Sequence, residues 1–163
     1  MPRFARVARA LLFALALSHT ALLAQFDSGS ITGLYTILVE GDDFNEPVSD
    51  AARSILDGHI SLSRDLANKN HYPSVDILAS ISRVMIDIVD PEQRQRANEI
   101  INIVATYKKA EALINIGAYV KGSNPDIDYA IRMIDRINAF LRQNIDEKVD
   151  FERTKREMAA LFN

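Results

Sequence analysis

The hydrophobic pattern changes along the chain, and the change lies near Asp90. Before it, residues 30–39 (SITGLYTILV) are almost continuously apolar and rich in β-branched and aromatic side chains. Such a run is typical of a strand that is covered on both faces in a parallel sheet. After Asp90, apolar residues recur at every third or fourth position, as on one face of a helix. The pattern therefore predicts an α/β part followed by an all-α part.

Several short elements are expected before the change in pattern. The turn Gly-Asp-Asp at residues 41–43 ends the apolar run, and Pro47 suits the first position of a short helix that continues to Leu56. Residues 59–63 are predicted as another short strand, and residues 64–68 as one or two turns of helix. This single βαβ-like unit has too few strands for an independent parallel sheet, so we interpret it as an α/β remnant.

A long helix is predicted after the change in pattern. Asp90 is a good N-cap residue, and Pro91 fits the first helical position. The helix is expected to continue to about Ile116, with Gly117 as its stop. Its predicted apolar face consists of Ala97, Ile100, Ile101, Val104 and Ala105.

Two more helices are predicted towards the C-terminus. Asn124 and Pro125 form the start of the first, and Asp150 the start of the second. The first has an apolar stripe of Ile127, Ile131, Ile134, Ile137 or Asn138, and Leu141. The second is expected to bury Phe151, Met158, Leu161 and Phe162. Because the connections are short, residues 90–163 are predicted to form a small helical bundle.

The first 25 residues have the pattern of a secretory signal peptide. A basic start with three arginines is followed by an apolar stretch over residues 11–24 and a small residue at its end. That stretch is short for a membrane span, and Ser18, His19 and Thr20 interrupt it. The alternatives are an amphipathic helix of a cytosolic protein and a misread start ahead of a truncated gene. We treat residues 1–27 as a separate, divergent segment.

Composition and charge exclude several classes of site. The chain has 163 residues, of which 48% are hydrophobic and 25% charged, as in an ordinary globular domain. It contains no cysteine, so disulfides, thiolate metal sites and a cysteine nucleophile are excluded. A net charge of -3 does not favour nucleic acid as a partner. His59 and His71 stand alone in the sequence, so we predict no metal site; the acidic turn at residues 40–43 either serves magnesium or is simply solvated.

Three long words in the sequence closely resemble the flagellar export ATPases. They are GSITGLYTILVEGDDFNEPVSDAARSILDGHISLSRDLA (residues 29–67), HYPSVDILASISRVM (71–85) and INIGAYVKGSNPDIDYAI (114–131). That family is similar in fold to the subunits of the rotary ATP synthase. The resemblance implies the last strands of a RecA-like P-loop NTPase core over residues 28–89, followed by a C-terminal helical domain over residues 90–163.

The resemblance also implies three site residues. Arg83 matches the family's arginine finger, which reaches the γ-phosphate of ATP bound to the neighbouring subunit; pairing with Asp76 or Asp87 is the structural alternative. Tyr72 matches the tyrosine that stacks on the adenine ring, with a core tyrosine as the alternative. Tyr119 lies in the segment that borders the same adenine pocket, and a purely structural role stays open for it.

The phosphate-binding loop of this superfamily is absent from the 163 residues. No segment fits G-x-x-x-x-G-K-[ST], and the family's magnesium-binding aspartate and catalytic glutamate are also missing. ATP and Mg²⁺ are therefore implied only by the family, and hydrolysis by this chain alone is not expected. The resemblance implies a homohexamer that works with export-apparatus proteins and export substrates, in the cytoplasm and peripheral to the inner membrane.

Other functions are also compatible with the sequence. An injectisome-type export ATPase is the nearest rival interpretation within the same class, although Asn115 and the words Gly-Ala-Tyr and Asn-Pro-Asp-Ile-Asp-Tyr favour the flagellar side. A secreted or periplasmic helical interaction module would explain the first 25 residues. A third possibility is a regulator that joins intact subunits and lowers their activity. Lys108 and Lys109 depart from the acidic segment of the rotary subunit, which favours an export-type protein.

Overall fold

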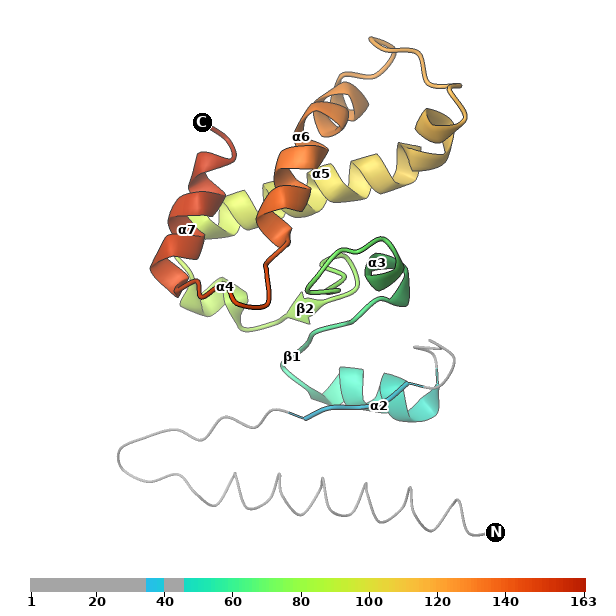
Figure 1. Ribbon diagram of the computed structural model, residues 1–163. Helices are drawn as coiled ribbons and strands as arrows, with labels where there is room; N and C mark the ends of the chain where they lie inside the picture. The colour runs from blue at the N-terminus through green and yellow to red at the C-terminus, as the bar shows by residue number, and fades with distance from the viewer. Residues whose placement is uncertain (1–34, 40–45) are drawn as a thin grey trace, which may run out of the picture. The chain divides into compact units, whose positions relative to one another are not determined.

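A computed structural model of the protein describes residues 35–39 and 46–163 (Figure 1). The chain forms two compact units, residues 1–46 and residues 47–163, and every helix and strand below belongs to the second. The first half of the strand predicted at residues 30–39 lies outside the described residues. Its second half, residues 35–39, is not in a strand, and Leu38 is 95% exposed. That part of the prediction is wrong, because among the described residues no strand pairs with this segment.

The short helix α2 (Pro47–Ile55) confirms the element predicted from Pro47. Asp50 lies in its first turn and Arg53 in its last turn, so each charge faces the helix end of opposite partial charge. The next helix, α3 (Arg64–Asn68), also has the predicted bounds. The Ser63 side chain caps it by accepting a hydrogen bond from the Leu66 amide.

Two short strands, β1 (Gly58–His59) and β2 (Ile81–Ser82), form an antiparallel pair with Gly58 opposite Ser82. No strand was predicted at residues 81–82, and the parallel neighbours expected for residues 30–39 are not found among the described residues. The strand predicted at residues 59–63 is also shorter than expected. At Ser61 the amide donates to the Ser80 hydroxyl, so a side chain takes the place of a ladder carbonyl.

One-turn helix α4 (Met85–Ile88), which was not predicted, leads into the long helix α5 (Pro91–Asn115). As predicted, the Asp90 carboxylate caps α5, accepting a hydrogen bond of 2.8 Å from the Gln93 amide. Gly117 ends the helix with a φ of +69°, and the following amide of Ala118 donates to Leu113 O. This is the usual C-terminal arrangement for a left-handed glycine.

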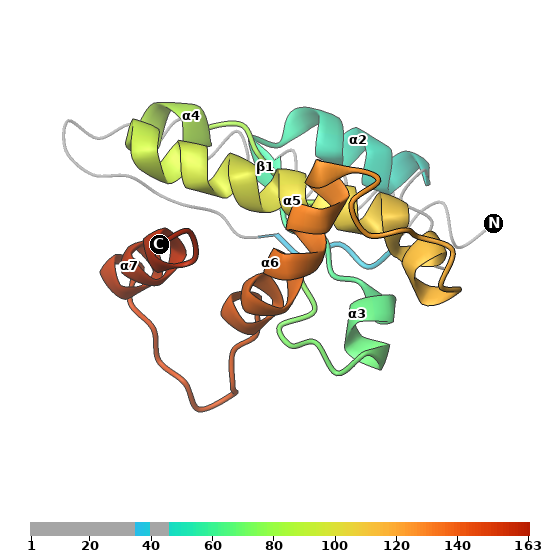
Figure 2. The same ribbon diagram turned by 90° about the horizontal axis from the view of Figure 1, so that it is seen from above.

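Helices α6 (Pro125–Leu141) and α7 (Phe151–Ala160) complete the chain, and both begin at the predicted caps. In both views α6 crosses the middle of α5, while α7 lies beside the first half of α5 (Figures 1 and 2). The helical bundle predicted for residues 90–163 is therefore confirmed. Among the helices of residues 46–163 we find none with an apolar run that could span a bilayer.

The core of the bundle lies where α5, α6 and α7 meet, and Ile137 is completely buried there. The predicted burial is wrong for two residues of the apolar faces, since Ile101 is 40% exposed and Phe151 is 62% exposed. Ile103, which was not predicted, is buried instead, because α6 packs on the face of α5 that carries Ile100 and Ile103. The central cluster consists of Ile100, Ile103, Ala130, Met133, Ile137, Met158 and Leu161.

Candidate functional site

Arg83 follows directly after β2 and is held at both its backbone and its side chain. Its amide donates a 2.8 Å hydrogen bond to Asp57 O, which extends the β1–β2 pairing by one residue. Its guanidinium donates to Ser54 O at 3.4 Å and Arg53 O at 3.3 Å, both in the last turn of α2. The last carbonyls of a helix lack helical partners and carry a partial negative charge, so a guanidinium is well placed there.

The predicted alternative partners of Arg83 are otherwise engaged or not in contact with it. The Asp76 carboxylate accepts hydrogen bonds from the amides of Leu78 and Ala79, at 2.9 and 3.1 Å. Its other oxygen lies 3.6 Å from Lys108 Nζ. Within residues 46–163, Arg83 forms no ion pair with Asp76 or with Asp87. Among residues 46–163, the guanidinium of the exposed Arg83 therefore binds main-chain carbonyls of α2 and no carboxylate.

Gly58 determines how closely β1 approaches β2 just ahead of Arg83. A Cβ atom at this position would lie 2.7 Å from Ile81 O and 3.3 Å from Ser82 Cα. Both neighbours are backbone atoms and cannot turn aside as a side chain could. Glycine is therefore required for the strand pairing that positions Arg83.

Tyr72 is half-exposed, with 53% of its surface accessible, so the alternative of a core tyrosine does not hold. Its carbonyl accepts a 2.9 Å hydrogen bond from the amide of Gln143, just beyond the end of α6. The preceding residue, His71, is buried. Burial, and secondly the positive charge of Arg142, lower the pKa of His71. The segment that carries Tyr72 is thus bound to the end of α6.

Tyr119 lies in the loop between α5 and α6, and its hydroxyl is occupied. The hydroxyl oxygen lies 3.0 Å from Asn124 O and 3.1 Å from Asp128 Oδ1, and its one proton is shared between these acceptors. Asp128 Oδ2 also accepts a 2.9 Å hydrogen bond from the Gly122 amide. These contacts give Tyr119 a structural role in ordering the loop.

The structure does not bring the two tyrosines together. Tyr119 contacts Asp128 in the first turn of α6, whereas Tyr72 contacts Gln143 just past its last turn. At about 1.5 Å per residue, these two contacts are separated by roughly 20 Å of helix. Tyr119 and Tyr72 are therefore bound to opposite ends of α6.

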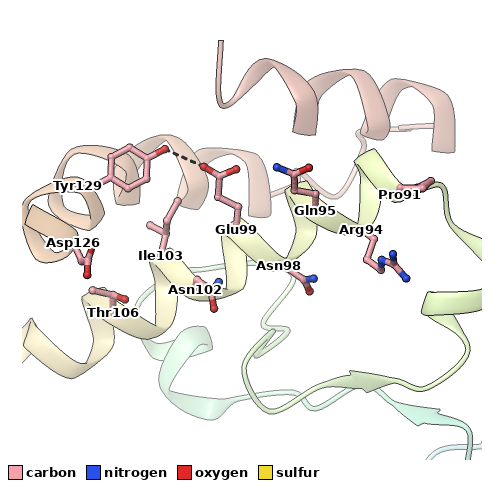
Figure 3. A pocket seen from close by; sticks show the side chains of 10 residues that line it. All are labelled: Pro91, Arg94, Gln95, Asn98, Glu99, Asn102, Ile103, Thr106, Asp126 and Tyr129. Atoms are coloured by element: carbon pink, nitrogen blue, oxygen red, sulfur yellow. Dashed lines mark hydrogen bonds between the residues drawn. The ribbon is translucent and has the colours of Figure 1, made fainter.

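A polar groove of about 850 Å³ lies along α5, next to the start of α6 (Figure 3). Four of its residues follow one another at intervals of four positions along one side of α5: Arg94, Asn98, Asn102 and Thr106. From α6, Asp126 and Tyr129 close the end of the groove nearest to Thr106. This groove is not predicted from the sequence. The regular spacing of polar residues was the available signal, but a solvated helix face has the same pattern.

Tyr129 connects the two walls of this groove. Its hydroxyl donates to Glu99 Oε1 at 3.2 Å, and Glu99 Oε2 lies 3.5 Å from the guanidinium of Arg96. Burial, and then the hydrogen bond with Glu99, raise the pKa of Tyr129. The phenol therefore stays protonated at neutral pH and holds the start of α6 against α5.

The described residues contain no group of three histidine or carboxylate side chains that could hold a metal ion. The acidic turn at residues 40–43 lies outside the described residues. Among residues 46–163, Arg83 and Tyr72 are the predicted site residues whose side chains are exposed.

Two family models match consecutive segments of the sequence. Residues 13–82 match the nucleotide-binding domain of the ATP synthase alpha/beta family, and residues 89–160 match the T3SS EscN ATPase C-terminal domain. The chain matches the C-terminal part of the flagellar and type III export ATPases. The first match begins inside the segment that we predicted as divergent (residues 1–27). A secreted or periplasmic module is not supported by these matches.

Similar proteins come from both branches of this export ATPase family. The chain is 46% identical to the flagellum-specific ATP synthase of Buchnera aphidicola subsp. Baizongia pistaciae over 85% of its length, and spans 31% of that relative. It is 45% identical to the type 3 secretion system ATPase of Pseudomonas syringae pv. tomato over 78% of its length, and spans 28% of that relative. The chain thus covers about a third or less of these relatives, and it corresponds to their C-terminal part.

Solved structures of an export ATPase share this fold. The assembled ATPase EscN from the enteropathogenic E. coli type III secretion system is 43% identical, with a TM-score of 0.79, and the match covers 83% of our chain and 33% of EscN. EscN in complex with its central stalk EscO is 40% identical, with a TM-score of 0.75 over 85% of our chain and 32% of EscN. The fold class expected from the sequence, part of a RecA-like core followed by a helical bundle, is confirmed.

Proposed function

We propose that this chain works inside an assembly of export ATPase subunits, where Arg83 acts on ATP bound by a neighbouring subunit. The reaction would be ATP hydrolysis coupled to type III protein secretion, of the flagellar kind. The observation that carries this proposal is the position of Arg83: an exposed guanidinium directly after β2, with no carboxylate partner in residues 46–163.

The geometry of Arg83 suits an arginine finger. Its side-chain hydrogen bonds, at 3.3 and 3.4 Å, are long, and both acceptors are neutral carbonyls. A phosphate oxygen is a stronger acceptor, because charge-assisted hydrogen bonds are about twice as strong as neutral ones. The guanidinium can therefore leave α2 for a nearby γ-phosphate, while the amide bond to Asp57 keeps its backbone in place. In other NTPases such an arginine contributes about 10³–10⁵ to the rate.

Tyr72 is our candidate for stacking on the adenine ring. Its ring is half-exposed, as a stacking platform must be, and base–aromatic stacking contributes about 1–3 kcal/mol per base. Tyr119 is kept as a border residue of the adenine pocket by resemblance alone, since its occupied hydroxyl favours a role in ordering the loop.

ATP and Mg²⁺ would be held mainly by elements that the 163 residues do not include. In this superfamily the phosphates and the metal ion are bound by the phosphate loop, and no segment here fits that motif. The chain alone is therefore expected not to hydrolyse ATP. A homohexameric arrangement, contacts with export-apparatus proteins and export substrates, and a cytoplasmic place at the inner membrane belong to the same proposal.

A complementation assay tests the proposal. The partner is the flagellum-specific ATP synthase of Bacillus subtilis, which is 46% identical over the matched region, in a variant whose residue aligned with Arg83 is alanine. That variant has a phosphate loop but no finger, whereas our chain has the finger but no phosphate loop. We expect the mixture to hydrolyse ATP at least tenfold faster than the partner variant alone, as measured by phosphate release.

Two variants of our chain serve as controls in this assay. Arg83→Ala should give no rescue, and Arg83→Lys should give little, because an ammonium group lacks the planar fork of the guanidinium. Co-sedimentation reports whether mixed assemblies form. A mixture no faster than the partner variant, whether or not the chain co-sediments, contradicts the proposal, as does equal rescue by Arg83→Ala.

Inhibition of intact assemblies by these 163 residues is the second function that we propose. A subunit position filled by these 163 residues alone would not bind phosphates through a phosphate loop. If the chain is a regulator, excess chain should lower the rate of the unmodified B. subtilis enzyme. An unchanged rate despite co-sedimentation would exclude inhibition.

A further inference from the structure

We propose that His59 and Ser61 are positioning residues for Arg83, because their side chains fix the bulge that aligns β2 with β1. In this role neither residue touches the nucleotide, and each acts through the main chain that carries Arg83. Their effect on the reaction rests on the proposed function. Their effect on the main chain of Arg83 does not, and it can be measured on the full chain without a partner.

Residues 76–80 form this bulge just before β2. Leu62 pairs with Val75 in an isolated antiparallel bridge. His59 pairs with Ile81 where β1 meets β2. Two residues lie between these pairs on the β1 side and five on the β2 side, so the bulged side carries three extra residues. Bulges are common beside active sites, where they redirect a side chain.

The bulge decides which way the Arg83 side chain points. Both strands have two residues each, and two-stranded pairs are at best marginally stable in water, so their main chains alone hold the alignment weakly. A shift of the bulge by one position would turn the side chains of β2 and Arg83 to the opposite face, because side chains alternate along a strand. The guanidinium would then leave Arg53 O and Ser54 O. Contacts that hold the bulge in place therefore position Arg83.

His59 and Ser61 supply such contacts from the β1 side. His59 Nε2 lies 2.9 Å from Ala79 O, and because a carbonyl oxygen only accepts, this nitrogen carries the proton. The Ser61 hydroxyl donates to the same Ala79 O at 3.1 Å, and the Ser61 amide donates to Ser80 Oγ at 2.9 Å. Ser80 Oγ in turn donates to Asp76 O at 2.6 Å, inside the bulge. Both lone pairs of Ala79 O are thus used by side chains from β1 and its continuation.

The burial along residues 59–62 is the reverse of the usual arrangement. Ser61 is buried, whereas its neighbours Ile60 and Leu62 are 74% and 63% exposed. A buried hydroxyl costs free energy unless it is hydrogen-bonded, so Ser61 is tolerated there through its contacts with the bulge. The inward position of a polar side chain between two exposed apolar ones is explained by the task of holding the bulge.

Amide hydrogen exchange of the ¹⁵N-labelled full chain tests the placement of Arg83. His59→Phe keeps a flat ring but removes the donor, whereas His59→Gln keeps a side-chain N–H donor of similar reach. We expect the Arg83 amide to exchange about fivefold or more faster in His59→Phe, from the loss of one hydrogen bond to a carbonyl. Ser61→Ala should act in the same direction, and His59→Gln should restore slow exchange. Thr154→Ala loses a hydroxyl-to-carbonyl hydrogen bond of 3.0 Å in α7 and is the matched control, with unchanged exchange at Arg83.

The complementation assay measures the consequence for the reaction. Titration of the chain into the partner variant gives a plateau rate and the chain concentration at half of that rate. In His59→Phe the plateau should fall by a factor similar to that for exchange, while the half-maximal concentration stays the same, since a displaced finger changes the rate and not the assembly. His59→Gln should recover the plateau. An unchanged plateau, or a higher half-maximal concentration as the sole effect, would contradict the proposal.

Three exchange results would also overturn it. The first is unchanged exchange at Arg83 in His59→Phe or in Ser61→Ala. The second is equally accelerated exchange at Ile137 on α6, which would indicate a general loss of stability. The third is failure of His59→Gln to restore the exchange of Arg83. If the unmodified chain gives no rescue, the proposed function fails, and the exchange results still decide whether His59 and Ser61 position Arg83.

Discussion

Replacement of Ile137 by alanine is the sharpest test of the core. Ile137 lies on α6 and is completely buried in the cluster that joins α5, α6 and α7. The substitution removes three carbon atoms, and at about 0.8 kcal/mol each the lost burial costs about 2.4 kcal/mol. A residual cavity of about 50 Å³ would cost a further 1.2 kcal/mol or so, at about 24 cal/mol per Å³. We therefore expect a loss of about 3–4 kcal/mol in the free energy of unfolding.

Such a loss is large for a unit of this size, since small domains are stable by only about 5–15 kcal/mol. Urea unfolding followed by circular dichroism at 222 nm measures it, as a lower midpoint with an unchanged slope. Ile145→Ala is the matched control, because the same atoms are removed from a side chain that is 100% exposed. Its effect should stay within about 0.5 kcal/mol of zero.

The comparison of these two isoleucines tests whether Ile137 is packed at the centre of the α5, α6 and α7 core. Equal effects of the two substitutions would mean that Ile137 is not the central residue of the core. A loss below about 1 kcal/mol for Ile137→Ala would mean the same, because a completely buried isoleucine cannot be truncated at so small a cost.

Three further predictions concern the segments around the candidate site. Gly58→Ala should destabilise the protein by about 1–3 kcal/mol, because its Cβ would meet Ile81 O at 2.7 Å; amide exchange at Arg83 should become faster, and unchanged exchange would contradict the role given to Gly58. His71 has a lowered pKa, so the folded protein binds fewer protons there than the unfolded chain; stability should fall as the pH drops below about 6.5. His71→Gln should reduce this fall in urea midpoints between pH 7.5 and 5.5, and an identical fall would show that other groups cause it. The pKa of Asp90 is lowered, mainly by its hydrogen bond with Lys155 at 2.7 Å and then by that with the Gln93 amide. The contribution of Asp90 to the stability of the folded protein is therefore present above about pH 4, and it is lost as the pH falls through the lower pKa of the folded state. Asp90→Asn keeps the helix cap but removes the ion pair, so its thermal midpoint should depend less on pH between 3 and 6; equal dependence would exclude the pair as the cause.

The helices were predictable because their signals are local. The first amides of a helix lack acceptors within the helix, and a polar side chain just before it can supply one. Three predicted residues do so at the predicted positions: Asp90, Asn124 and Asp150. Gly117 marks a stop for an equally local reason, its positive φ. Which face of a helix is buried is less predictable. Ile101 belonged to the expected face but is 40% exposed, because the crossing position of α6 selects the face and no local pattern records it.

The strand pairing and the candidate site depended on contacts between distant residues. Gly58 and Ser82 lie 24 positions apart, and nothing in either short segment predicted their antiparallel pairing. Resemblance supplied Arg83 and Tyr72 as site residues, but it did not supply the carbonyls of α2 or the amide of Gln143 that hold them. The row from Arg94 to Thr106 was visible in the sequence, but only the structure distinguishes a groove from a solvated face.

The hydrogen bond between Tyr72 O and the Gln143 amide has a consequence for how the two family-matched segments can diverge. It joins residues on either side of the boundary at residues 83–88, which separates the end of the first matched segment from the start of the second. The ion pairs of Lys69 with Glu111 and of Asp76 with Lys108 cross the same position. A helical segment exchanged between relatives by recombination would lose these contacts unless its new neighbour supplied matching groups. The two segments are therefore expected to be inherited together.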